Sequence, residues 1–106
     1  MENFNSNQIL TERLLSVPIY ATDGKKQKEV LVTFMHCLSR WTWHIVESER
    51  QEDGDILMFG YVESGLGDEC SEWGYTLLSQ IAEIPLIVPI IQDGVVINLD
   101  GNLSYK

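Results

Sequence analysis

The amino-acid sequence predicts a single α+β domain: a mainly antiparallel sheet of about five strands, with one or two short helices covering one face. Three observations indicate this: stretches of alternating apolar residues, Asp-Gly pairs between them, and two segments with helical spacing of apolar residues. The chain has 106 residues, of which 44% are hydrophobic and 22% charged. That length suits one domain over residues 1–106, and that composition argues against disorder. We expect only residues 1–8 to form a frayed polar lead.

Two segments have the pattern of a short helix. In residues 7–15 the apolar side chains recur at helical intervals, and Asn7 is a favourable N-cap. Residues 77–84 have the same spacing. We expect Pro85 to end this second helix, because proline has no backbone N–H to donate.

The middle of the chain reads as three strands: residues 29–35, 41–49 and 56–62. The first two alternate, whereas the third is apolar on both faces, as expected of a central strand. Asp53 and Gly54 favour a type I′ turn between the last two strands. That turn would place Ile45 opposite Val62.

A second hairpin is expected near the C-terminus. Asp93 and Gly94 are its turn signal, and they join strands predicted over residues 86–92 and 95–99. Pro89 cannot donate to a ladder, so the first of these strands should lie at a sheet edge. Another Asp-Gly pair, at residues 100–101, predicts a turn into a weak last strand.

The charge is strongly acidic and unevenly distributed. Seven Lys and Arg residues against 16 Asp and Glu residues give a formal net charge of −9. Residues 51–106 hold all of this excess, since their only base is Lys106. This balance argues against direct binding of nucleic acid or an anionic membrane, whose phosphates need Lys and Arg. No signal segment is visible, and the longest apolar run is shorter than the about 20 residues of a membrane span. We expect a cytoplasmic protein.

The familiar motifs of phosphate, nucleophile and metal chemistry are absent from the sequence. Four residues match the ligand number of zinc: His36, Cys37, His44 and Cys70. Neighbours on a strand point to opposite faces, so His36 and Cys37 are poorly placed to share an ion. The acids around Cys70 disfavour a reactive thiolate. We therefore predict reduced cysteines, no catalytic residue, no metal and no cofactor.

Aromatic residues gather on one face of the predicted strand over residues 41–49. Alternation puts Trp41, Trp43 and Glu47 on that face, and His44 on the other. Exposed indoles would form a stacking platform, whereas buried ones would belong to the core beneath a helix, which we favour. We interpret Glu47 as the solvated end of the strand.

A glycine-containing acidic loop follows the third predicted strand. Its carboxylates lie near further aromatic residues, as at many protein-interaction surfaces. The residues that we predict to bind a partner combine this loop with the two indoles: Trp41, Trp43, Glu63, Asp68, Glu69 and Glu72.

Five short motifs in order resemble a family of small acidic prokaryotic proteins of unknown function, often carried by phages, plasmids and other mobile elements. They are Pro-Ile-Tyr-Ala-Thr at 18–22, Trp-Thr-Trp at 41–43, Phe-Gly-Tyr-Val-Glu at 59–63, Glu-Trp-Gly-Tyr at 72–75 and Pro-Ile-Ile-Gln-Asp at 89–93. Gln92 stands where the family commonly has Arg. The family has no established activity, so the resemblance implies a prokaryotic or mobile-element setting and no catalytic role.

Two functions follow as hypotheses. The first is a non-enzymatic module whose acidic second half docks a basic protein; one form of it is a DNA mimic carried by a mobile element. The alternative is a small ligand-binding domain or enzyme that uses the Trp41/Trp43 face and the Glu63–Glu72 loop. The oligomeric state is left open, because the predicted edge strand can pair with the same strand of a second copy.

Overall fold

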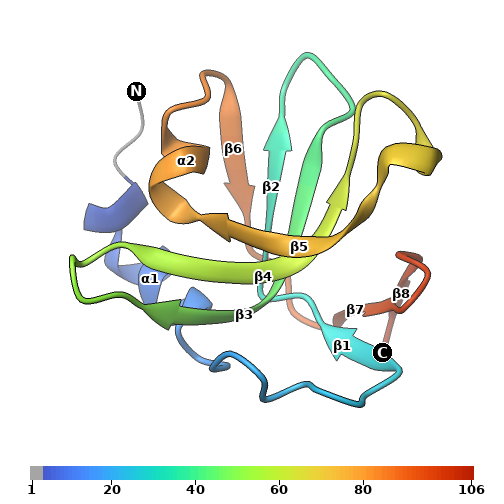
Figure 1. Cartoon of the computed structure of the whole chain (residues 1–106), viewed down its shortest axis with the longest axis horizontal. Helices are drawn as coiled ribbons and strands as arrows, with labels where there is room; N and C mark the ends of the chain where they lie inside the picture. Colours follow the sequence, from blue (N-terminus) through green and yellow to red (C-terminus); the bar gives the residue numbers. More distant parts are fainter. Residues whose placement is uncertain (1–3) are drawn as a thin grey trace.

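The computed structural model describes residues 4–106 and has two antiparallel sheets. The larger sheet has the order β5-β4-β3-β2-β6 and the smaller has the order β1-β7-β8 (Figure 1). The strands of the larger sheet are β2 (Val32–His36), β3 (Thr42–Arg50), β4 (Ile56–Glu63), β5 (Glu72–Leu77) and β6 (Ile87–Ile90). Those of the smaller are β1 (Gln27–Glu29), β7 (Val95–Asn98) and β8 (Leu103–Tyr105). With two short α-helices, the predicted α+β class is confirmed.

The helices are α1 (Gln8–Leu14) and α2 (Leu78–Ala82). Short 3₁₀ turns occupy Phe4–Ser6 and Asp68–Cys70. The predicted cap of α1 is confirmed, because the Asn7 side chain accepts a hydrogen bond from the Leu10 N–H at 3.1 Å. Neither helix is long and apolar enough to cross a membrane, and no other helix in residues 4–106 is.

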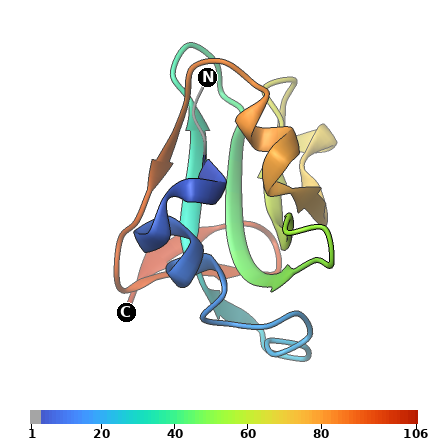
Figure 2. The ribbon, with the colours of Figure 1, turned by 90° about the vertical axis from the view of Figure 1, so that its left-hand side faces the viewer.

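Both helices cover the same face of the larger sheet (Figures 1 and 2). Their apolar residues pack with those of β2, β3 and β4 in one cluster, at whose centre Phe34 is fully buried. Phe4 is also buried there, with its ring centroid 5.5 Å from that of Phe34. The polar lead predicted over residues 1–8 is therefore wrong at Phe4, which belongs to the core; residues 1–3 lie outside the described part.

Two bent segments join the sheets. β1 leads directly into β2, and β6 leads into β7, so the two segments pair antiparallel in both sheets. At the bend, the Val30 N–H donates to the Val95 carbonyl at 2.9 Å. The turn after β7 reaches back to β5, where Trp73 Nε1 donates to the Leu99 carbonyl at 2.9 Å. The smaller sheet thus folds over the face opposite the helices and encloses a second core, centred on Val46 and Ile97.

The hairpin predicted around Asp93 and Gly94 is wrong. β6 pairs with β2, where Pro89 lies opposite Phe34, and β7 pairs with β1 and β8. The Asp-Gly turn instead carries the chain from one sheet to the other, with Gly94 at φ +80°. The edge position predicted from Pro89 is confirmed, because β6 ends the larger sheet.

The predicted register of β3 and β4 is also wrong. Their connection spans five residues, since Arg50 pairs with Ile56, and a bulge at Val46 shifts the pairing again. Ile45 therefore lies opposite Gly60 rather than Val62. Ile45 lies in the helix-covered core and Val46 in the second core, on opposite faces of the sheet.

Candidate ligand-binding site

A pocket of about 370 Å³ opens between the face opposite the helices and the smaller sheet. Its walls are mostly apolar and come from both sheets: Val30, Met35, Ile90, Val95 and Leu103. The short strand β8 forms one side through Leu103, Ser104 and Tyr105. Pockets at the mouth of a curled sheet, apolar with a few convergent polar groups, are common small-molecule sites.

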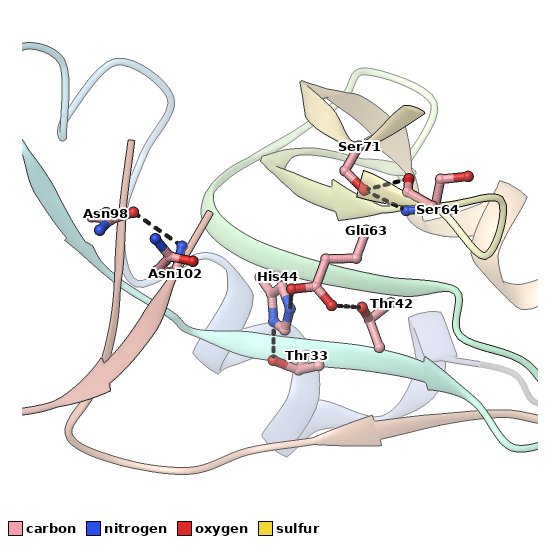
Figure 3. Close-up of polar contacts among 9 residues, drawn as sticks. Thr33, Thr42, His44, Glu63, Ser64, Ser71, Asn98 and Asn102 are labelled. Carbon is pink, nitrogen blue, oxygen red and sulfur yellow. Dashed lines mark hydrogen bonds and ion pairs between the residues drawn. The ribbon is translucent and has the colours of Figure 1, made fainter. Parts of the chain in front are cut away.

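Four of the polar side chains that line the pocket form one chain of contacts across three strands (Figure 3). His44 Nδ1 lies 2.9 Å from Thr33 Oγ1. His44 Nε2 lies 3.5 Å from Glu63 Oε1, and Glu63 Oε2 accepts a hydrogen bond from Thr42 Oγ1 at 3.0 Å. Each group is thereby fixed on at least one side by a neighbour.

Strand pairing brings these side chains together. Thr33 lies directly opposite His44 on β2 and β3, and Thr42 lies opposite Glu63 on β3 and β4. Directly opposed residues on antiparallel strands point to the same face. The alternation of β3 therefore places His44 on the pocket face and its neighbour Trp43 on the helix face.

His44 is buried and neutral. Only 4% of the residue is exposed, and burial lowers its pKa below the ordinary value of 6.5, against the opposing pull of Glu63. The 3.5 Å contact is too long for a good hydrogen bond, and Nε2 has no hydrogen-bond partner in the described part of the chain. A buried nitrogen without a partner is rare, because most buried polar atoms are hydrogen-bonded.

Glu47, unlike the partly exposed Glu63, is a buried carboxylate, and it has a different environment. It accepts hydrogen bonds from the N–H groups of Tyr20 and Thr22, each at 2.8 Å, and from the Thr22 hydroxyl. Lys28 Nζ in turn donates to the Thr22 carbonyl at 2.6 Å. Burial raises the pKa of Glu47, but these donors outweigh it and the pKa is lowered. With its partners supplied by the chain, Glu47 anchors the turn before β1, and its interpretation as a solvated strand end is wrong.

The two indoles predicted to bind a partner lie on the helix side of the sheet. Their ring centroids are 6.0 Å apart at 25°. Trp43 is buried in the helix-covered core, as favoured from the sequence. Trp41 is half-buried. Its ring packs so closely against Gly65 that a Cβ at that position would collide with it. A shallow hollow beside the indoles also touches Ile84.

The predicted partner-binding residues are not brought together. Glu63 faces the pocket, opposite the side on which Trp41 and Trp43 pack. Glu69 and Glu72 are exposed, at the 3₁₀ turn and the start of β5, and Asp68 begins that turn. The sequence does not predict β5, whose first two residues fall at the end of the acidic loop expected over residues 64–73. Whether these carboxylates bind a partner stays a prediction.

The four potential zinc ligands are also separate. Cys37 and Cys70 are exposed free thiols. The described residues contain no group of three or more side chains suited to hold a metal. Alternation predicts that His44 lies on the face opposite Trp41 and Trp43, but the sequence does not single it out as part of a ligand pocket. Thr33 and Glu63, the neighbours of His44, follow only once the register is known.

In comparisons with known proteins, no family model, no curated protein and no solved structure matches this chain.

Proposed function

We propose that this protein binds a small molecule in the pocket between its two sheets. The observation that carries the proposal is the His44 Nε2 atom, buried at the pocket without a hydrogen-bond partner among the described residues. A buried polar atom left in this state costs about 1–3 kcal/mol. A ligand that supplies the missing partner regains part of that free energy when it binds.

The shape and lining of the pocket support the proposal. A volume of about 370 Å³ lies within the range of roughly 300–1,000 Å³ typical of small-molecule sites. Apolar walls provide binding through surface burial, and the few polar groups orient a ligand. Thr33 and Thr42 hold His44 and Glu63 in place before binding, which limits the entropy lost on complex formation.

A fragment screen observed by amide NMR tests this function. We expect hits to shift the resonances of Thr33, His44 and Glu63. The Leu103→Trp variant, which enlarges a half-exposed side chain on the pocket face of β8, should lose those hits. The Ser39→Trp variant crowds the hollow beside Trp41 instead and should keep them. Hits that survive Leu103→Trp, or a screen without pocket hits, would contradict the proposal.

Docking of a basic protein is a second candidate, and one observation favours it. Glu69 and Glu72 are exposed and form no ion pair with any Lys or Arg in residues 4–106. An unneutralised acidic surface of this kind steers cationic partners. A DNA mimic is one version of this candidate. Pull-downs at rising salt test it, because an electrostatic complex weakens as the Debye length shortens. A partner retained equally at low and high salt would argue against it.

A further inference from the structure

We propose that the ligand of this pocket carries an ammonium group on an apolar stem, and that the ammonium binds between Glu63 and His44. This inference rests on the proposed small-molecule function and specifies the ligand class. The ammonium would donate one hydrogen bond to Glu63 Oε1 and one to His44 Nε2. The stem would lie along the apolar walls.

Charge is the first argument. Among the described residues that line the pocket, Glu63 alone is charged at neutral pH, because burial keeps His44 neutral and no Lys or Arg is present. An anionic ligand would face this carboxylate without any counter-charge. The chain as a whole carries a formal charge of −9, which attracts cations and repels anions. A positively charged ligand is therefore favoured both at the pocket and at a distance.

The geometry of the two acceptors is the second argument. Glu63 Oε1 and His44 Nε2 are 3.5 Å apart, so one nitrogen atom can lie within about 2.9 Å of both once the partly exposed Glu63 side chain shifts to uncover the buried Nε2. Thr33 Oγ1 can accept from Nδ1–H, which leaves the lone pair of Nε2 free to accept. Thr42 occupies the other oxygen of Glu63, so Oε1 is the one left for a ligand. An ammonium with three donors satisfies both atoms together.

The apolar walls and the small number of metal-ligating side chains indicate an organic cation rather than a metal ion. Val30, Val95 and Leu103 offer apolar surface for methylene groups or a ring. A metal ion would need four or more ligands, whereas only two of the described lining residues, His44 and Glu63, are of that type. The same ammonium chemistry could come from a free amine or from a lysine side chain, and the experiment separates these sources.

The test is an NMR titration with three probes of similar size: 2-phenylethylamine, 2-phenylethanol and 3-phenylpropanoate. At neutral pH and low salt we expect the amine to bind roughly tenfold more tightly than the alcohol, because charge-assisted hydrogen bonds are the stronger ones. The carboxylate should bind most weakly. A fourth probe, Nα-acetyl-lysine methylamide, represents a lysine side chain. If it binds more tightly than 2-phenylethylamine, the natural ligand is a lysine side chain; if it binds more weakly, the natural ligand is a small amine.

Two variants locate the charge that is responsible. Glu63→Gln should remove the preference for amine over alcohol. Glu49→Gln removes the same charge from an exposed position across from Leu57 and should retain it. Imidazole ¹⁵N shifts of His44 should report a proton on Nδ1 in the amine complex.

The outcomes that overturn the inference differ from those that overturn the function. Equal binding of amine and alcohol at the pocket, or an unchanged preference in Glu63→Gln, overturns the ammonium inference while leaving a ligand pocket. Failure of all the probes to shift pocket resonances overturns it as well, and the broader fragment screen then decides whether the pocket binds any small molecule.

Discussion

The two faces of the five-stranded sheet differ in how completely they are covered. Of the residues that the structure describes, thirteen buried apolar ones fill the space between the sheet and its helices. On the other face four described residues form the buried cluster, flanked by three partly buried aromatic rings, and the pocket opens beside them. The helix face therefore supplies most of the stability. The opposite face, with less apolar burial, leaves room for a binding site.

This difference follows from what covers each face. On one side, α1 and α2 place Leu14 and Leu78 into the core, where both are fully buried. On the other side, cover comes from the smaller sheet, whose last strand, β8, is three residues long and exposed throughout. Because β8 is so short, the pocket around His44 stays open.

Two neighbouring residues on β2 point to different faces of the sheet, and substituting them should give the largest difference in the free energy of unfolding. Phe34→Ala removes a fully buried ring from the helix face and should lower the free energy of unfolding by about 3–5 kcal/mol. Met35→Ala, at the pocket wall, should cost less than about 1 kcal/mol because its side chain is 38% exposed. Denaturant unfolding measures both. Similar losses would contradict the division of roles between the faces.

Glu47 should be the most important polar residue for stability. Glu47→Gln replaces one accepting oxygen by a donor that faces N–H groups, so we expect a loss of about 1–3 kcal/mol at neutral pH. The lowered pKa of Glu47 means that its contribution is present above 4.5 and is lost as the pH falls through the lowered value. The deficit of the variant should therefore shrink in acid. Glu49→Gln, on the same strand but exposed, is the control and should cost little.

His44 should make the protein less stable in mild acid. Because its pKa is lowered in the folded state, the unfolded chain takes up a proton first as the pH falls below 6.5. The free energy of unfolding should therefore decrease from pH 7.5 to pH 5.5, and His44→Gln should reduce that decrease. His36→Gln, which alters the other histidine, should preserve it. An equal decrease in wild type and His44→Gln would show that His44 is not held neutral by burial.

The smallest change in stability belongs to the variant with the largest expected effect on binding. Leu103 is exposed on the pocket face of β8, so Leu103→Trp should alter the free energy of unfolding by less than about 0.5 kcal/mol while filling the pocket. Thermal unfolding checks that the fold is intact. A large loss of stability would mean that β8 is part of the core rather than one side of an open pocket.

Local signals in the sequence predicted the local structure well. The cap at Asn7 and the long apolar strand β4 are where their residue patterns place them. Long-range pairing was not predictable in the same way. The Asp93-Gly94 pair specifies a turn but not which strand each arm joins, and β2 is the partner that β6 takes.

The candidate site depends on pairing, which is why only part of it was predictable. Alternation alone puts His44 on the face opposite Trp43. The bulge at Val46 depends on contacts with distant parts of the chain, and it moves Glu47 away from the face of Trp43. Gly60 illustrates the same limit, because its close approach to β3 follows only from the register: a Cβ there would meet the His44 carbonyl oxygen in the backbone.

The most direct test of the account is to locate a bound amine by intermolecular nuclear Overhauser effects. With 2-phenylethylamine bound, we predict contacts from its protons to the methyl groups of Met35, Val95 and Leu103, which line the pocket. Contacts to Trp41 and Ile84 instead would place the ligand in the hollow on the helix side and contradict the assignment of binding to the opposite face.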